Sequence, residues 1–240
     1  MNTKKETRRG YVDTDKRDFS DANLITLQKA QQEIHWLLDR GYPIKNAVTF
    51  VGNHYLLSTR QRSALTRATS PTASITRRKN KEVFACDNQI VHIDGFNLII
   101  TMEVALSNST LIKCMDGTTR DLAGLRGTYR LIDKTDIAIT LIGEKLQSMK
   151  IAGVLFYLDA PVSNSGRLKT KILQLLNDYG YTVNVELISS PDALLKGKEN
   201  VVTTDAIILN DCISWINLGS SIISDCIESL KVINLSSYYK

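Results

Sequence analysis

Short apolar runs that end in a carboxylate recur along the later two thirds of the chain. Three of them end at Asp94, Asp159 and Asp205, and each is followed by apolar residues at helical spacing. Apolar runs separated by amphipathic helices are typical of a buried parallel sheet with helical crossovers. The pattern predicts an α/β domain over residues 83–240, with a last strand over 213–218 and a closing helix over 221–233.

The first third of the chain has a different pattern. Residues 21–68 carry apolar positions at helical spacing, interrupted by turn residues, and Ser58 is suited to cap the third helix. Residues 1–20 are polar and predict a disordered basic tail, and residues 69–82 are rich in Ser, Thr, Arg and Lys and predict a basic linker. The small N-terminal domain is therefore expected to be all-α, with a helix-turn-helix-like arrangement.

Composition places the chain among ordinary globular proteins. Hydrophobic residues make up 43% and charged residues 23%, and no apolar run approaches the ~20 residues that a membrane helix needs. The N-terminus lacks the apolar core of a secretory signal. The four cysteines form no CxxC pair, which favours reduced thiols over a zinc site. We expect a soluble cytoplasmic protein that does not bind membranes.

Charge is divided unevenly along the chain. Residues 1–82 hold 16 Lys and Arg against 8 Asp and Glu, whereas residues 83–240 hold 14 against 17. A basic part joined to an acidic part suits an enzyme that acts on nucleic acid, because one part collects phosphates while the other concentrates metal ions. Arg60, Arg62 and Arg67 on the third helix are candidates for phosphate contact. The alternative is a structural helical cap with a solvated basic face.

The strand-end aspartates predict a metal site. The carboxyl ends of parallel strands meet at one edge of a sheet, so these carboxylates are expected to share one pocket. Mg²⁺ and Mn²⁺ prefer such oxygen ligands. Asn97, Glu103 and Asp192 are further candidates, although Glu103 also fits an exposed helix position and Asp192 a helix N-terminus. Thr203 and Thr204 are placed to orient Asp205.

Two other segments are candidates for phosphate binding. The first directly follows the strand that ends at Asp159, where helical N–H groups would be free, and it contains Ser163, Asn164, Ser165 and Arg167. The second is the Gly-, Arg- and Asp-rich segment 116–130, which contains Arg120, Arg126 and Arg130, with Tyr129 available to stack on a base. The alternatives are helix capping in the first segment and an internal Arg–Asp network in the second.

These motifs resemble those of a known superfamily. The order Asp94-Gly95-Phe96-Asn97, then Asp159, then Thr203-Thr204-Asp205 resembles the PIN-like nucleases, especially their NYN branch. Residues 22–225 are also similar to an uncharacterised prokaryotic family, best known from archaea, in which a helical domain of unknown function precedes a PIN-like domain. That similarity is carried by residues 40–43, 50–53, 60–65, 120–130 and 158–167.

The resemblance implies a three-layer PIN-like domain and metal-dependent hydrolysis of phosphodiester bonds, in RNA in preference to DNA. Asp94, Asp159 and Asp205 match metal-ligand positions, and Asn97 matches the polar residue at the helix start. Asp192 and Glu103 match less clearly. The oligomeric state stays open, with a homodimer as one option.

Functions of other classes make different demands on the sequence. A non-catalytic RNA- or nucleotide-binding module would show carboxylates too far apart to share a metal, or a Lys or Arg paired with Asp94. An aspartyl-phosphate enzyme is disfavoured because Gly-Phe-Asn follows Asp94, and a Rossmann cofactor site because no GxGxxG motif follows the first strand. Ser/His/Asp catalysis is disfavoured because His35 and His54 lie in the helical part and His92 within a strand.

Overall fold

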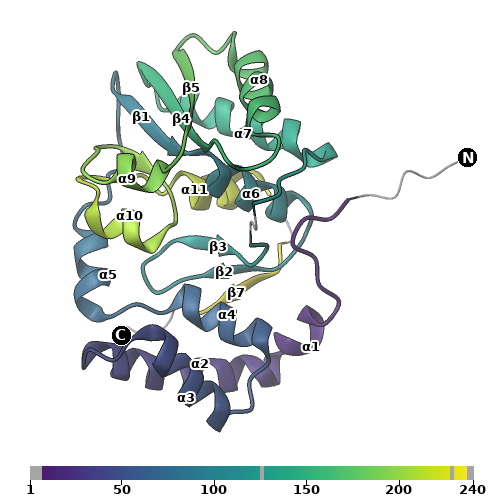
Figure 1. Ribbon diagram of the computed structural model, residues 1–240, viewed down its shortest axis with the longest axis vertical. Coiled ribbons are helices and arrows are strands. Elements are labelled where there is room, and N and C mark those ends of the chain that lie inside the picture. The colour runs from purple at the N-terminus through teal and green to yellow at the C-terminus, as the bar shows by residue number, and fades with distance from the viewer. Residues whose placement is uncertain (1–6, 125–126, 228–229, 237–240) are drawn as a thin grey trace, which may run out of the picture.

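The structure is a computed structural model that describes residues 7–124, 127–227 and 230–236 (Figure 1). Along the long axis, a four-stranded sheet with its helices lies at one end and the N-terminal helices at the other. A three-stranded sheet lies between them. The acidic residues predicted above belong to the four-stranded end of the molecule.

The four-stranded sheet is parallel throughout and has the strand order β5-β4-β1-β6. Its strands are β1 (Ile90–Asp94), β4 (Gly153–Asp159), β5 (Thr182–Ile188) and β6 (Val201–Val202). Asp94 lies opposite Tyr157 on β4, so the carboxyl ends of β1 and β4 reach the same edge of the sheet. This edge is where ligand sites form in open parallel sheets.

Helices cover both faces of this sheet. On one face pack α6 (Gly95–Leu106), α7 (Asp133–Ser148), α8 (Ser165–Leu176) and α11 (Leu218–Cys226), and on the other pack α9 (Pro191–Leu195) and α10 (Ala206–Asp211). Side chains of β4 alternate between the two cores, with Phe156 in the first and Tyr157 in the second. Trp215 is fully buried in the second core, as the sequence predicted. The chain is thus a mixed α/β protein with a parallel sheet.

A second sheet differs from the sequence prediction. It has the order β3-β2-β7, with β2 (Leu111–Lys113) antiparallel to β3 (Thr119–Asp121) and parallel to β7 (Val232–Asn234). The predicted closing helix over 221–233 is wrong in its second half, because Ile233 packs in the core of the N-terminal helices. The predicted strand over 213–218 is reduced to isolated bridges at Trp215.

The N-terminal helices share a core with this second sheet. They are α1 (Asp15–Asp18), α2 (Asp21–Asp39), α3 (Ile44–His54), α4 (Thr59–Ala68) and α5 (Thr72–Lys79). Ser58 caps α4 in a capping box with Gln61, as its position predicted. Leu27 and Leu65 belong to the same buried cluster as Ile112 and Ile233, so strands from the later part of the chain complete the helical core.

Two segments predicted to be irregular are ordered instead. Within the predicted tail, residues 7–20 include α1 and the buried Phe19, and Asp15 pairs with Arg60 at 2.9 Å. The predicted linker contains α5, on which Arg78 is buried. Composition predicted a disordered tail and a basic linker because polar residues are expected to be solvated when their buried partners are not known.

The start of α6 leaves no space for a side chain at Gly95. A Cβ atom there would lie 2.5 Å from Cδ2 of Leu158 and 3.1 Å from the backbone oxygen of Tyr157. We expect Gly95→Ala to lower the free energy of unfolding by about 1–3 kcal/mol through overpacking. Gly166→Ala in α8 is the matched control, since nothing lies within 4 Å of its added Cβ, and it should be neutral or slightly stabilising. Urea unfolding of both variants is the measurement, and equal effects would contradict the packing explanation.

Candidate acidic site

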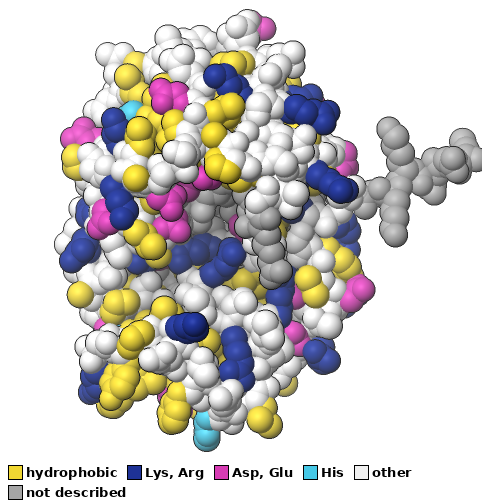
Figure 2. Space-filling view, viewed as in Figure 1, with side chains coloured by type: hydrophobic (Ala, Val, Ile, Leu, Met, Phe, Trp, Pro, Cys, Tyr) yellow, Lys and Arg dark blue, Asp and Glu magenta, His cyan; other side chains and the backbone are white. Residues whose placement is uncertain are grey.

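The strand-end aspartates open into one cavity of about 200 Å³, which we call the acidic cavity. It is lined by Arg67, Asp94, Phe96, Asn97, Ile100, Asp121, Gly124, Asp159, Asp192 and Asp205. Figure 2 shows a hollow with acidic side chains gathered on one side and Lys and Arg side chains on the other. The fold therefore brings together the carboxylates of Asp94, Asp159, Asp192 and Asp205.

Asp94 is the most enclosed of these carboxylates, with 8% of its surface exposed. Its Oδ2 accepts a hydrogen bond of 2.8 Å from the hydroxyl of Thr203. The pKa of Asp94 is raised to about 7, chiefly by burial and also by the nearby charges of Asp192 and Asp205, against the lowering effect of the Thr203 hydrogen bond. The ionised form of Asp94 is therefore short of compensating positive charge.

The segment that follows β6 contributes Asp205 to the lining of the acidic cavity. The backbone N–H and the hydroxyl of Thr204 donate to Oδ1 of Asn97 at 2.8 and 3.0 Å, and the backbone N–H of Asp205 donates to the Thr203 hydroxyl at 3.1 Å. The Asp205 carboxylate accepts from the N–H groups of Ile207 and Ile208 and so caps α10. The threonines were predicted to orient Asp205. The Thr203 hydroxyl does accept from the backbone of Asp205, but neither threonine contacts the Asp205 carboxylate, since their hydroxyls donate to Asp94 and Asn97.

Asp159 and Asp192 are less enclosed. Burial raises the pKa of Asp159, with a further contribution from Asp192, and burial and Asp205 raise the pKa of Asp192. Within the described ranges, neither side chain hydrogen-bonds to another residue or forms an ion pair. Both carboxylates are thus free to turn toward a cation in the cavity.

The donor chemistry fits a hard divalent cation, because the converging groups are carboxylate and amide oxygens. Among the residues that the structure describes, no Lys or Arg forms an ion pair with Asp94, Asp159, Asp192 or Asp205. In the same part of the chain, no three His, Cys, Asp or Glu side chains stand close enough to hold one metal ion. Shared ligation therefore requires side-chain rotation, for which Asp159 and Asp192 have the freedom.

Asp121 also lines the acidic cavity and was missed in the sequence. It ends β3, and its carboxylate accepts from the Thr101 hydroxyl at 3.0 Å and from the backbone N–H of Ala123 at 2.7 Å. Arg67 of α4 lies 3.6 Å from the same carboxylate. A strand ending in Asp was again the available signal, but β3 has three residues and no apolar run to mark it.

Glu103 does not reach the acidic cavity, so its prediction as a metal ligand is wrong. Its side chain is fully buried, where it pairs with Arg9 and accepts hydrogen bonds from the hydroxyls of Tyr129, at 2.7 Å, and Thr135. Burial raises the pKa of Glu103, and Arg9, Thr135 and Tyr129 offset part of that effect. Tyr129 is itself fully buried and is not available to stack on a base.

Removing the Arg9 charge should expose the cost of burying Glu103. We expect Arg9→Met to lower the free energy of unfolding at pH 8 by about 2 kcal/mol. This loss is smaller than the loss expected from breaking a fully buried ion pair, because the Arg9 side chain is partly exposed. The pKa of Glu103 then rises further above its unfolded value. Much of the lost stability should accordingly return as the pH falls from 8 to 5, in urea unfolding curves. A loss independent of pH would contradict this.

Most of the predicted phosphate-binding arginines are engaged inside the protein. Arg60 pairs with Asp15, Arg62 donates to the carbonyls of Leu57 and Gly52, and Arg120 is buried against Asp116 at 2.6 Å. The alternative of an internal Arg–Asp network therefore describes Arg120. Arg60 and Arg120 are thus paired with carboxylates, and all three guanidinium nitrogens of Arg62 donate to protein oxygens, so these side chains are not free for a ligand.

The remaining phosphate candidates divide into two groups. Ser163 and Asn164 hold the backbone of Tyr129, at 3.0 and 2.6 Å, and Ser165 is buried at the start of α8. Arg130 and Arg167 are exposed. Arg126 lies outside the described residues.

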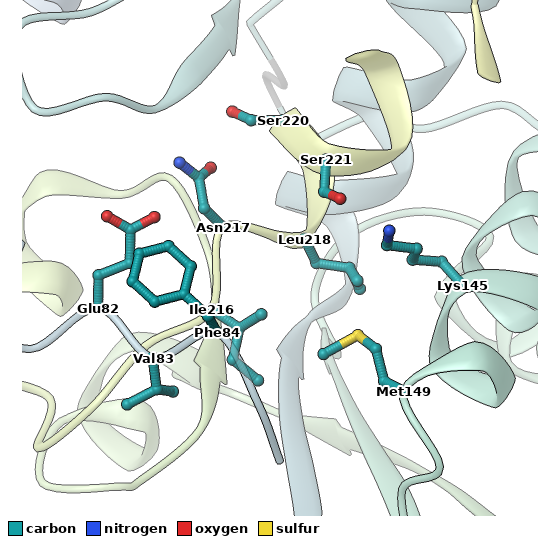
Figure 3. Close-up of a pocket in the computed structure, with 10 residues that line it drawn as sticks. All are labelled: Glu82, Val83, Phe84, Lys145, Met149, Ile216, Asn217, Leu218, Ser220 and Ser221. Atoms are coloured by element: carbon teal, nitrogen blue, oxygen red, sulfur yellow. The ribbon is translucent and has the colours of Figure 1, made fainter. Parts of the chain in front are cut away.

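Another hollow, of about 330 Å³, lies between residues 82–84, the end of α7 and the start of α11 (Figure 3). Leu218 and Met149 point toward each other across it. Lys145 on its rim pairs with Asp225 at 2.8 Å. Glu82 is the one carboxylate among its described lining residues, so this hollow lacks the converging acidic groups of the acidic cavity.

Comparison with known proteins places the chain in a family without an assigned activity. Residues 84–221, which contain the parallel sheet and most of the acidic cavity, match the family described as a domain of unknown function, DUF5616. The chain belongs to that family. Residues 26–81 match a second family, described as a protein of unknown function, DUF434. An uncharacterized protein of the archaeon Methanocaldococcus jannaschii, MJ0935, is 33% identical over 209 residues, covering 86% of this chain and 99% of that protein. No solved structure matches. No helix among the described residues is long and apolar enough to cross a membrane.

Proposed function

We propose that the protein is a metal-dependent nuclease with a PIN-like catalytic domain that hydrolyses phosphodiester bonds, in RNA in preference to DNA. The observation that carries the proposal is the convergence of Asp94, Asp159, Asp192 and Asp205 on one cavity without ion-paired Lys or Arg among the described residues. Uncompensated carboxylates at the carboxyl ends of parallel strands favour a cation.

The ionisation of the carboxylates links metal binding to pH. Asp94 and Asp205 are held by Thr203 and by the start of α10, whereas Asp159 and Asp192 complete the site by turning inward. Since a metal ligand must be ionised and the pKa of Asp94 is about 7, cation affinity should increase as the pH rises through 7. A bound Mg²⁺ or Mn²⁺ supplies charge stabilisation and a more acidic water for the displacement at phosphorus.

Arg67 is suited to the phosphate. It lines the acidic cavity from the side of the N-terminal helices, and about two fifths of its side chain is exposed. Its guanidinium faces Asp121 rather than the four converging aspartates. A phosphate that enters the cavity would therefore meet the Arg67 guanidinium, which would exchange part of its contact with Asp121 for a phosphate oxygen.

A non-catalytic RNA- or nucleotide-binding module is the second candidate. It is favoured by the spacing of the acidic groups, since no three of them in the described part of the chain are close enough to share an ion. It is disfavoured by the lack of a described Lys or Arg paired with Asp94. In this case the protein would bind nucleic acid equally well with and without a divalent cation.

Calorimetric titration with Mn²⁺, followed by incubation with labelled RNA and DNA, tests the proposal. We expect wild type to bind Mn²⁺ and to cleave RNA, and Asp159→Asn to lower the affinity at least tenfold because it removes a free ligand. Asp178→Asn, an exposed carboxylate away from the cavity lining, is the matched control. Lack of Mn²⁺ binding by wild type at pH 8 would refute the metal-dependent function.

A further inference from the structure

A basic cavity of about 490 Å³ adjoins the acidic cavity. We call it the arginine cavity, and it is lined by Thr7, Arg8, Arg9, Gly10, Ile100, Ala123, Gly124, Thr128, Arg130 and Ile132. Its described lining contains three arginines and no carboxylate. The N-terminal segment, predicted to be a disordered tail, therefore forms one wall of an electropositive cavity.

The arginines are fixed in different ways. Arg8 donates to the carbonyls of Ser107 and Asn108 at 3.0 and 2.9 Å and lies 3.7 Å from the centre of the Tyr11 ring. These contacts hold the guanidinium without neutralising it, since no carboxylate pairs with Arg8 among the described residues. Arg9, by contrast, forms an ion pair with the buried Glu103, which neutralises its charge.

Arg130 is the arginine most available to a ligand. Its side chain is exposed, and its guanidinium has no hydrogen bond or ion pair in the described part of the chain, while its backbone oxygen accepts from Arg9. The hydrogen bond from Arg9 to the backbone oxygen fixes the main chain of Arg130 at the cavity. The guanidinium of Arg130 stays available to bind an anion. A phosphate oxygen is the acceptor that a guanidinium fork fits.

The two cavities are adjacent, because Ile100 and Gly124 line both of them. A nucleic-acid backbone that passes over these two residues would extend from the arginine cavity to the carboxylates. Asp94 is recessed, with 8% of its surface exposed, and a phosphate can approach it when its strand is not paired in a duplex. The geometry points to a single-stranded nucleic acid whose backbone is held by Arg8 and Arg130 and whose reacting phosphate lies at the acidic cavity. This inference rests on the proposed function, since it names the form of the substrate.

Fluorescence anisotropy with a labelled mixed-sequence 12-nucleotide RNA tests the inference. The measurement is made in EDTA, so that neither metal binding nor cleavage contributes. We expect wild type to bind the single strand more tightly than the corresponding RNA duplex. Arg130→Gln should weaken binding about tenfold, because a charge-assisted contact is lost. The salt dependence, as the slope of log K against log salt, should fall by about 0.7.

Arg77→Gln is the matched control, because Arg77 is an exposed arginine of α5 outside the lining of both cavities. Arg8→Gln should weaken binding in the same direction as Arg130→Gln, and unfolding curves check that each variant is folded. Binding by Arg130→Gln and Arg8→Gln equal to that of wild type, or duplex bound as tightly as single strand, would overturn the inference. Because these measurements need no metal, their failure is distinguishable from a failure of Mn²⁺ binding at the acidic cavity.

Discussion

Asp94→Asn should strongly weaken Mn²⁺ binding, abolish nuclease activity and, in EDTA at pH 8, make the protein more stable. Metal affinity should fall by roughly two orders of magnitude or more, because the variant loses the central carboxylate of the cavity. Stability should rise because the ionised wild-type carboxylate is buried beside Asp192 and Asp205. A pKa raised from 3.8 to about 7 corresponds to roughly 4 kcal/mol, of which we expect Asn to recover about 2, since it keeps a carbonyl for Thr203.

The stability difference between wild type and Asp94→Asn should depend on pH. The pKa of Asp94 is higher in the folded than in the unfolded protein, so the folded state binds the proton more tightly. The free energy of unfolding of wild type should therefore increase as the pH falls from 8 through 7 toward 4, and the advantage of Asp94→Asn should disappear over that range. Urea unfolding at pH 8, 7 and 5 measures the difference between the two proteins.

Added Mn²⁺ should reverse the order of stability. It stabilises the protein that binds it, so wild type should become the more stable of the two at saturating Mn²⁺ while Asp94→Asn is unchanged. Asp178→Asn should follow wild type under every condition. Equal Mn²⁺ binding by wild type and Asp94→Asn, or a less stable Asp94→Asn in EDTA at pH 8, would contradict the assignment of Asp94.

Asp116→Asn should produce the largest loss of stability, about 3–5 kcal/mol, because it leaves two buried guanidinium groups without their carboxylate. Oδ2 of Asp116 accepts from Arg78 and from Arg120, each at 2.6 Å, and all three side chains are buried. Burial alone would raise the pKa of Asp116, but Arg120, Thr118 and Arg78 hold it below its ordinary value. The stabilisation is present above the unfolded pKa, near 4, and is lost as the pH falls through the lower folded value.

The same substitution should reach the acidic site indirectly. Arg78 also donates to Asn210 at 2.9 Å and to the carbonyl of Ala206 at 3.2 Å, so it connects α5 to the helix that starts after Asp205. Thermal and urea unfolding measure the loss, with Asp225→Asn as a control that breaks an exposed Lys–Asp pair and should change stability little. If Asp116→Asn and Asp225→Asn lowered the free energy of unfolding by similar amounts, burial of the Asp116 network would not determine how much it stabilises the protein.

The sequence was informative where one local pattern determines position. Apolar runs ending at Asp94, Asp159 and Asp205 were enough to place these carboxylates at one sheet edge, because successive parallel strands end on the same side. Their role as metal ligands stays a prediction. The capping box at Ser58 was similarly local, since its partner Gln61 lies three residues away.

The sequence was uninformative where a side chain meets a partner distant in the chain. Glu103 has the same spacing as an exposed helix residue, and its burial depends on Arg9, ninety-four residues earlier. Thr203 lies beside Asp205 in the sequence, yet its hydroxyl bonds to Asp94, 109 residues away. Arg120 was read as a ligand for phosphate because nothing local shows that Asp116, Arg78 and the Arg67 carbonyl surround it.

The position of β7 has a consequence for the order in which the protein matures during synthesis. Leu111 on β2 pairs with Val232, and the side chain of Gln31 on α2 donates to the carbonyl of Leu235, 204 residues away. The helices that leave the ribosome first therefore wait for nearly the whole chain, about 10–40 seconds at ordinary elongation rates, before their core is complete. During that interval Leu27 and Leu65 lack part of their apolar cover, so faster elongation should shorten the time in which the nascent chain exposes aggregation-prone surface.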